Sequence, residues 1–310
     1  MNGFGVLRPG PQSLLQDHGR AAWQHLGVSP CGPADLQAAA WANYLLGNRW
    51  GTPLLEVALG GLSLACGLDT WVAVTGAQVA VRLDGQPRPN WSRFAVQAGQ
   101  QLQLDPARTG QRAYLAVAGG FSAQARLGSV AVQQREGAGG LHGDGRALLA
   151  GDLLICRPAQ LPRPASVPAR LVPDYAQVPV LRVIVGGEGG SLPGRAGLDY
   201  LAQDWRVSPQ SDRMGVRLYS GGAVAPRLPL RREWSRGVCS GEIQLPPDGQ
   251  PIILLADRQS MGGYPALGWV HPLDLGLLAQ CAPRQQVRFR AASLSEVQAE
   301  LAAFYGFFRR

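Results

Sequence analysis

The sequence predicts a mainly β fold with a few short helices, divided into two β domains by a proline-rich linker. Between Leu54 and Leu154, apolar runs of strand length recur about every 8–12 residues and are separated by glycine, proline or aspartate. The chain of 310 residues contains 41 glycines and 24 prolines, which favours short strands and tight turns over long helices. Its length gives room for two domains of ordinary size.

Prolines mark the expected linker, because a sheet interior does not tolerate them at high density. They are Pro158, Pro162, Pro164, Pro168, Pro173 and Pro179. We therefore expect an N-terminal β-barrel domain over residues 1–160, a linker over residues 161–179 and a C-terminal β-barrel domain over residues 180–310.

Most elements are predicted from apolar periodicity and turn residues. Asp35 is expected to cap a helix over Leu36–Leu46, and Asp84-Gly85 to form a hairpin tip. Gly137–Gly145 is interpreted as a mobile loop, and Leu198–Trp205 as a short helix. The expected strands are Gly3–Leu7, Leu54–Leu59, Leu62–Ala65, Trp71–Thr75, Val79–Leu83, Gln101–Leu104, Arg112–Val117, Leu153–Cys156, Val180–Val185, Val216–Tyr219, Glu242–Leu245 and Pro251–Ala256.

Composition argues against several functional classes. The net charge of +8 comes from scattered arginines, which favours a solvated surface or anionic small molecules over a nucleic-acid groove. The chain contains no lysine, so it carries no lysine-linked biotin and no P-loop lysine. The cysteines and histidines lack zinc-ligand spacing. No apolar run reaches the ~20 residues of a membrane span, so we expect a cytoplasmic protein with no membrane or nucleic-acid partner.

Three polar runs beside glycines are candidates for a site: Gln16–Arg20, Ser208–Gly215 and Asp257–Tyr264. The first could instead be a turn closed by an Asp17–Arg20 pair, and the third could be a barrel corner. Polar loops that flank buried strands often meet a ligand. We therefore expect the three runs to line one shared cleft.

Motifs along the whole chain resemble those of one protein family. They are QDHGR (Gln16–Arg20), CGPAD (Cys31–Asp35), AN followed by LGN (Ala42–Asn48), LE (Leu55-Glu56), TGA (Thr75–Ala77), RAYLAVAGG (Arg112–Gly120), LGS (Leu127–Ser129), SDRMGVRL (Ser211–Leu218) and GGYP (Gly262–Pro265). This order is similar to that of the C subunits of ATP-dependent 5-oxoprolinase. The same family contains antagonists of kinase inhibitors and the second subunits of allophanate hydrolase, and is also called the biotin-dependent carboxyltransferase family. Its usual Gln-Thr-Thr before GGYP is Gln259-Ser260-Met261 here.

The resemblance implies two cyclophilin-like β-barrels and a role as one subunit of an enzyme. A B-type subunit, which is kinase-inhibitor-like, and an A-type subunit would be its partners in opening 5-oxoproline to glutamate with ATP. ATP and a divalent cation such as Mg²⁺ are the expected cofactors, bound here or only in the complex. Two alternatives remain: a carboxyltransferase acting on urea or a related amide with a separate biotin carrier, or a regulator that antagonises a kinase-inhibitor partner.

The resemblance also assigns candidate site residues. Asp17, Arg20, Asp212, Arg213 and Tyr264 are the expected catalytic residues, and Gln16, Asp35, Asn43, Glu56, Arg112, Ser211, Asp257, Gln259, Ser260, Gly262 and Gly263 are the expected substrate-binding residues. No resident metal ligand is assigned, although Asp17, Asp212 and Asp257 could contact the cation of a nucleotide. If Arg213 serves the site, Arg213→Ala should abolish activity and change stability only by the roughly 0.5 kcal/mol of a surface substitution.

Overall fold

The computed structural model describes residues 2–221, 228–232 and 234–309. The prediction of a mainly β fold is confirmed. Contacts divide the chain into two compact units, of which unit 1 comprises Met1–Ala21, Cys31–Asp174 and Phe307–Arg310. Unit 2 comprises Ala22–Pro30 and Tyr175–Gly306. The domain boundaries at residues 160 and 179, and the cyclophilin-like character of the barrels, stay predictions.

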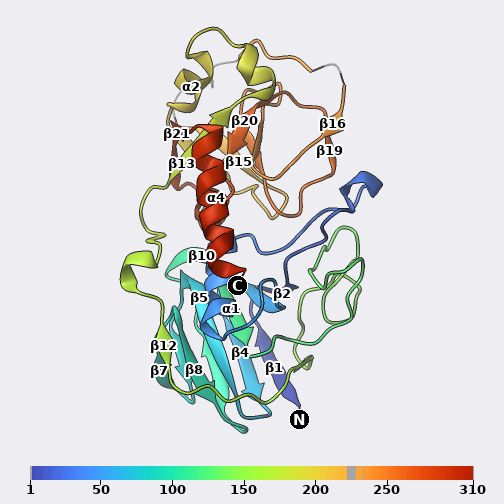
Figure 1. Ribbon diagram of the computed structural model, residues 1–310, viewed down its shortest axis with the longest axis vertical. Helices are drawn as coiled ribbons and strands as arrows, with labels where there is room; N and C mark the ends of the chain where they lie inside the picture. Colours follow the sequence, from blue (N-terminus) through green and yellow to red (C-terminus); the bar gives the residue numbers. More distant parts are fainter. Residues whose placement is uncertain (1, 222–227, 233, 310) are drawn as a thin grey trace. The chain divides into compact units, whose positions relative to one another are not determined.

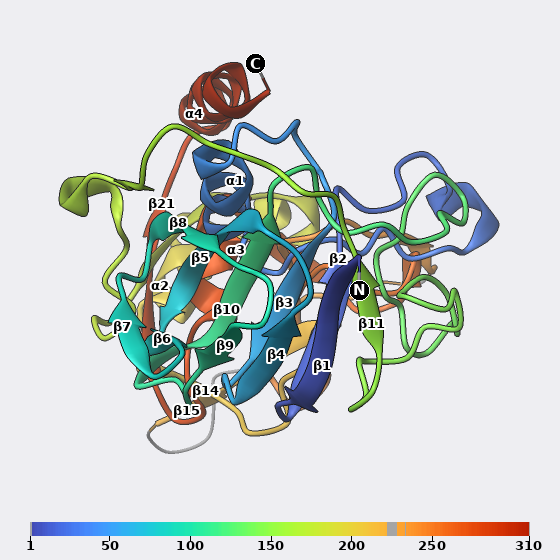
Figure 2. The ribbon, with the colours of Figure 1, turned by 90° about the horizontal axis from the view of Figure 1, so that it is seen from below.

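In the described part of unit 1, the strands form two six-stranded sheets. Figure 2 shows strands of both sheets. The first sheet has the order β11-β1-β4-β9-β6-β7, with β1 (Gly3–Pro9), β4 (Leu62–Cys66), β6 (Val81–Leu83), β7 (Gln86–Arg88), β9 (Gln101–Leu104) and β11 (Leu153–Ile155). The second has the order β12-β8-β5-β10-β3-β2, with β2 (Gln12–Gln16), β3 (Leu54–Ala58), β5 (Thr70–Gln78), β8 (Ser92–Val96), β10 (Thr109–Val117) and β12 (Ala165–Ser166).

Apolar side chains from both sheets form one buried cluster in unit 1. Leu64 of β4 and Val74 of β5 are both fully buried within it. Successive strand residues point to opposite faces, so alternate positions along each strand enter this core. The core therefore fixes the register of the antiparallel pair β10–β3, which places Tyr114 opposite Glu56.

Helix α1 (Leu36–Leu45) begins where the sequence predicted. The Asp35 carboxylate accepts a hydrogen bond from the Ala38 backbone N–H at 3.0 Å, which caps the helix. The helix packs on β5 and β10 (Figure 2), and Thr75 Oγ1 of β5 donates to the Ala38 carbonyl at 2.7 Å. A 3₁₀ turn at Ala169–Leu171 follows later in unit 1.

Unit 2 contains a closed barrel with the order β13-β20-β17-β18-β15-β14-β21 in the described residues. Its strands are β13 (Val180–Val185), β14 (Trp205–Val207), β15 (Gly215–Ser220), β17 (Glu242–Gln244), β18 (Ile252–Leu254), β20 (Ala266–Val270) and β21 (Gln286–Ala291). A separate pair joins β16 (Arg236–Gly237) to β19 (Met261–Gly262). Parallel pairing of β13 with β21 brings an early strand of the unit beside its last one.

The helices differ more from the expectation than the strands do. Helix α2 spans only Ala196–Leu201, because Trp205 already belongs to β14. Helices α3 (Asp274–Ala279) and α4 (Leu294–Phe308) were not predicted. Helix α4 is the long red helix near the C-terminus in Figure 1. The signal for α4 is the Ser-x-x-Glu pattern at Ser293–Glu296, in which Ser293 Oγ accepts from the Glu296 N–H at 3.1 Å. Short 3₁₀ helices span Gln24–Leu26 and Gly187–Ser191.

Within the described ranges, no helix combines the length and the apolar character that crossing a membrane requires.

Candidate functional site

Asp17, which directly follows β2, holds a loop of unit 1 in place. Its Oδ1 accepts hydrogen bonds from the Gly19 N–H at 2.8 Å and from Ser129 Oγ at 2.5 Å. Its Oδ2 accepts from the Val130 N–H at 2.8 Å. The carboxylate is buried and engaged by these donors. The alternative of a turn closed by an Asp17–Arg20 pair is therefore wrong.

The Arg20 guanidinium, unlike the Asp17 carboxylate, is buried without hydrogen bonds to the described residues. Its side chain is 1% exposed, yet no nitrogen of its guanidinium has a hydrogen-bond partner in the described residues. Gln16 is also fully buried, with Nε2 donating to the Val132 carbonyl at 3.3 Å and Oε1 lacking a partner among the described residues. Native proteins hydrogen-bond most of their buried polar atoms, so this pair of neighbouring exceptions needs an explanation.

The structure brings Asp35, Glu56 and Arg112 together around Tyr114, a residue that was not singled out from the sequence. Tyr114 Oη donates to Glu56 Oε2 at 2.8 Å and accepts from the Asp35 N–H at 2.7 Å. Glu56 Oε2 also accepts from the Ala34 N–H at 2.8 Å, while Arg112 Nε lies 3.5 Å from Glu56 Oε1. Burial, and then the nearby Glu56 charge, hold the pKa of Tyr114 well above its ordinary value. Tyr114 therefore stays a neutral hydrogen-bond donor in this cluster.

Three of the predicted site residues form hydrogen bonds to nearby backbone groups: Asn43, Ser211 and Asp212. Asn43 Nδ2 donates to the Thr52 carbonyl at 2.9 Å, which ties α1 to the following loop. Ser211 Oγ accepts from the Arg217 N–H at 3.2 Å. Asp212 Oδ1 accepts from the N–H groups of Met214 and Gly215, a turn that leads into β15.

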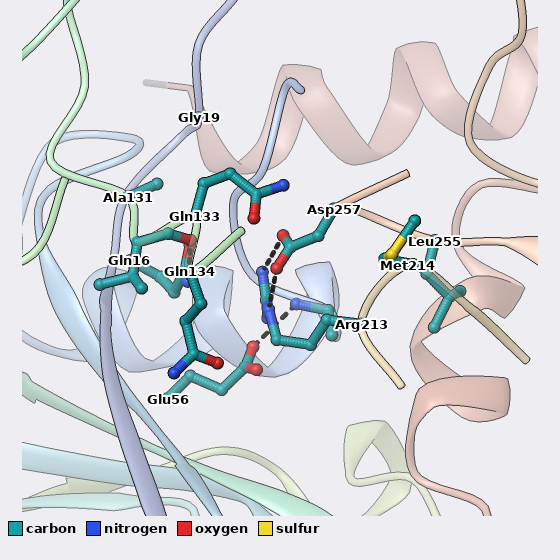
Figure 3. Close-up of polar contacts among 12 residues, drawn as sticks. Gln16, Gly19, Glu56, Ala131, Gln133, Gln134, Arg213, Met214, Leu255 and Asp257 are labelled. Carbon is teal, nitrogen blue, oxygen red and sulfur yellow. Dashed lines mark hydrogen bonds and ion pairs between the residues drawn. The ribbon is translucent and has the colours of Figure 1, made fainter. Parts of the chain in front are cut away.

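Arg213 and Asp257 of unit 2 form a buried, two-pronged ion pair (Figure 3). Nε of Arg213 donates to Oδ2 at 2.9 Å and Nη2 donates to Oδ1 at 2.8 Å. The side chains are 8% and 9% exposed. Two of the predicted polar runs thus meet within unit 2. Because Arg213→Ala would remove both of these hydrogen bonds from a buried carboxylate, we now expect a larger loss of stability than a surface substitution causes.

A cavity of about 500 Å³ in unit 2 is lined by Gly263 and Tyr264 of the third polar run. Tyr264 is 45% exposed, so its ring is accessible to a ligand. The other lining residues were not singled out from the sequence: Tyr200, Leu228, Leu230, Arg231, Arg232, Leu245, Pro246, Pro247, Gly249 and Pro265. Apolar walls with a few polar groups at this volume are typical of small-molecule sites.

The preceding loop is fixed by backbone contacts. Gly262 pairs with Arg236 through β19 and β16, and a Cβ on Gly262 would lie 2.5 Å from Gln244 Nε2. The Ser260 carbonyl accepts from the Val238 N–H at 3.1 Å, and the Gln259 carbonyl accepts from Arg258 Nη1 at 3.1 Å. Gln259 and Ser260 thus contribute backbone contacts that shape this loop.

Glu188 orients Arg232, one of the residues that line the cavity. Its Nη2 donates to Glu188 Oε2 at 2.7 Å and its Nε donates to Oε1 at 3.0 Å. Glu188 Oε2 also accepts from the Ala266 N–H at 2.8 Å. The hydrogen bonds from Arg232, and then the one from Ala266, lower the pKa of Glu188 from 4.5 to about 2.

Glu188→Gln is expected to lose a pH-dependent part of the stability. The lowered pKa stabilises the fold fully above pH 4.5, and this contribution disappears as the pH falls towards about 2. The free-energy difference between wild type and Glu188→Gln should therefore shrink over that range. Urea unfolding at a series of pH values measures it, and a difference that stays constant with pH would contradict the assignment.

The candidate carboxylates do not fit a resident metal ion. Asp17 is engaged by protein donors, and Asp257 is paired with Arg213. Among the residues that the structure describes, no group of three or more His, Cys, Asp or Glu side chains could hold one.

Residues 26–291 match the family described as carboxyltransferase domain, subdomain A and B. The chain is 35% identical over 291 residues to the C subunit of 5-oxoprolinase from Escherichia coli (strain K12), covering 94% of this chain and 92% of that protein. The corresponding C subunit from Haemophilus influenzae is 36% identical over 295 residues, with the same coverage of 94% and 92%. The urea amidolyase of Saccharomyces cerevisiae is 28% identical over 303 residues, which cover 92% of this chain but 16% of that protein.

Solved structures of related proteins are also similar to this chain. The urea amidolyase of K. lactis superimposes with a TM-score of 0.86 at 26% identity, covering 98% of this chain and 20% of that one. The protein TTHA0988 superimposes with a TM-score of 0.82 at 34% identity, covering 94% of this chain and 55% of that one. The chain thus spans about half the length of TTHA0988.

Proposed function

The chain belongs to the carboxyltransferase domain family, subdomains A and B, and on this basis we propose that it is the C subunit of an ATP-dependent 5-oxoprolinase. The family resemblance deduced from the sequence motifs is confirmed. The observation that carries the proposal is coverage: the match extends over 92% of each 5-oxoprolinase C subunit, but over 16% of a urea amidolyase.

The proposed reaction opens the lactam ring of 5-oxoproline to glutamate. A lactam carbonyl is a poor electrophile, and phosphorylating its oxygen would turn that oxygen into a leaving group. The complex would contain a kinase-inhibitor-like B subunit and an A subunit that completes hydrolysis. We assign ATP and its cation to the assembled complex, because the candidate carboxylates of this chain are engaged by protein donors. A reaction that consumes ATP suits a cytoplasmic location.

Tyr264 is the predicted catalytic residue that lines an open cavity, and we propose that it contacts a reactant there. Its aromatic face can stack on a flat ring, and its hydroxyl can hydrogen-bond. Arg231 in the same wall carries a guanidinium suited to carboxylate or phosphate. The joining of all three polar runs in one cleft stays a prediction.

Reconstitution with the co-encoded B and A subunits tests the function. The complex should release glutamate from 5-oxoproline with matching ATP hydrolysis, whereas the chain alone should be inactive. Tyr264→Ala should raise the KM for ATP or for 5-oxoproline, and unchanged KM values for both would refute its role. Turnover of urea with a biotin carrier protein, and none of 5-oxoproline, would favour a carboxyltransferase instead.

A further inference from the structure

Arg20 carries a buried positive charge that nothing in the described chain neutralises. The side chain is 1% exposed, and Nε, Nη1 and Nη2 all lack hydrogen-bond partners among the described residues. A buried charge without a partner is strongly unfavourable, which indicates that a bound anion completes the site.

The nearest carboxylate in sequence does not supply that anion. Asp17 is turned towards other donors: Oδ1 accepts from Gly19 and Ser129, and Oδ2 accepts from Val130. These bonds fix the carboxylate and keep it from pairing with Arg20. The loop therefore positions the Arg20 guanidinium while its Asp17 carboxylate is hydrogen-bonded to Ser129 and Val130.

Gln16 provides a buried acceptor, Oε1, that has no partner among the described residues, as the donors of Arg20 have none. Its Nε2 donates to the Val132 carbonyl, so the amide orientation is set and Oε1 is left without a partner. Arg20 lies against the same backbone segment: a Cβ on Gly139 would lie 2.6 Å from Arg20 Nη2 and 1.9 Å from the Ala131 carbonyl oxygen. Two buried groups of opposite hydrogen-bonding character thus flank residues 131–132.

We propose that Arg20 and Gln16 form a binding site for a small ligand that carries a carboxylate next to an N–H group. The guanidinium would pair with the carboxylate, and Gln16 Oε1 would accept from the N–H. Phosphate fits less well, because its oxygens offer the glutamine acceptor little to bind. The identification of this ligand as 5-oxoproline rests on the proposed function. The carboxylate of 5-oxoproline is attached to the carbon beside the lactam nitrogen.

The glycine-rich segment Gly137–Gly145 gains a role from this site. Gly139 has a φ of +75°, and its missing Cβ lets the backbone lie directly against the guanidinium. One hydrogen bond joins the segment to its surroundings, from the Gly140 N–H to the Val130 carbonyl at 2.8 Å, and another closes the segment on itself, from the Gly145 N–H to the Gly139 carbonyl at 2.9 Å. The segment thus covers Arg20, and its mobility stays a prediction. Since Arg20 is 1% exposed, a ligand reaches it only when its surroundings shift.

Arg20→Met in the reconstituted complex tests the proposal. Methionine keeps the unbranched apolar stem and removes the charge. The KM for 5-oxoproline should rise about 10- to 100-fold, the effect of losing a hydrogen bond to a charged group. The melting temperature of the variant chain should stay equal to that of the wild type or increase, because the unpaired buried charge is gone. Gln16→Leu should also raise KM.

Ligand-induced shifts in the melting temperature of the complex separate binding from turnover. 5-Oxoproline should raise the wild-type value but not that of Arg20→Met. 2-Pyrrolidinone, the same lactam without a carboxylate, and inorganic phosphate should have no effect. Arg82→Met is the matched control, since Arg82 forms a half-buried pair with Asp105 at 2.9 Å, and it should bind 5-oxoproline as the wild type does.

The two proposals fail in distinguishable ways. A complex that shows the Arg20-dependent shift without releasing glutamate would refute the proposed function and support the carboxylate site. A complex that cleaves 5-oxoproline equally well with Arg20→Met, or a variant that melts far below the wild type with unchanged KM, would overturn the carboxylate site. A shift produced by phosphate but not by 5-oxoproline would overturn it as well.

Discussion

Arg213→Ala is expected to lower the free energy of unfolding by about 3–5 kcal/mol. The substitution removes both hydrogen bonds from the guanidinium to Asp257 and leaves that carboxylate buried, with a side chain 9% exposed. A buried carboxylate that loses both hydrogen bonds from a cation does not regain them from water. Urea unfolding of the purified chain measures the effect.

Two comparisons show whether the lost pair is the cause. The double variant Arg213→Met/Asp257→Leu should recover most of the loss, because it removes the stranded charge. Arg217→Ala breaks the exposed pair with Asp248 at 3.4 Å and should change stability by no more than about 1 kcal/mol. If Arg213→Ala were as mild as Arg217→Ala, the buried pair would not stabilise the fold.

Glu56→Ala is expected to have a similarly large effect, about 3–5 kcal/mol, because it leaves several partners without their acceptor. Tyr114 Oη and the Ala34 N–H both donate to Glu56 Oε2 at 2.8 Å, and Arg112 lies 3.5 Å from Oε1. Glu56 is 2% exposed and Tyr114 is fully buried, so water does not replace the lost bonds. Thermal and urea unfolding of the variant measure the loss.

A double-mutant cycle with Tyr114→Phe identifies the shared hydrogen bond. The two substitutions remove opposite ends of one contact, so their effects should be non-additive by about 0.5–3 kcal/mol. Glu56→Gln keeps an acceptor oxygen and should be milder than Glu56→Ala. Additive losses in the cycle would show that Glu56 and Tyr114 do not act as one unit.

Local signals in the sequence were sufficient for several elements. The Asp35 cap precedes α1, and the Asp84-Gly85 tip joins β6 to β7, because capping and hairpin turns depend on residues a few positions apart. The C-terminal helix α4 also has such a signal at Ser293–Glu296, although no helix was predicted from it. Helix α2 was drawn too long because local propensity does not reveal that Trp205 pairs with β15 and β21.

The sequence by itself determined the β-rich class, many of the strands, the family and a set of polar candidates. It did not determine their partners: Ser129, which binds Asp17, is 112 residues away, and Asp257, which binds Arg213, is 44 residues away. Only the tertiary structure separated Arg213, whose charge is neutralised by Asp257, from Arg20, whose charge is buried without a partner among the described residues. Both arginines occur in similar polar runs beside glycine, and what distinguishes them is which distant residues the packed sheets bring against each guanidinium.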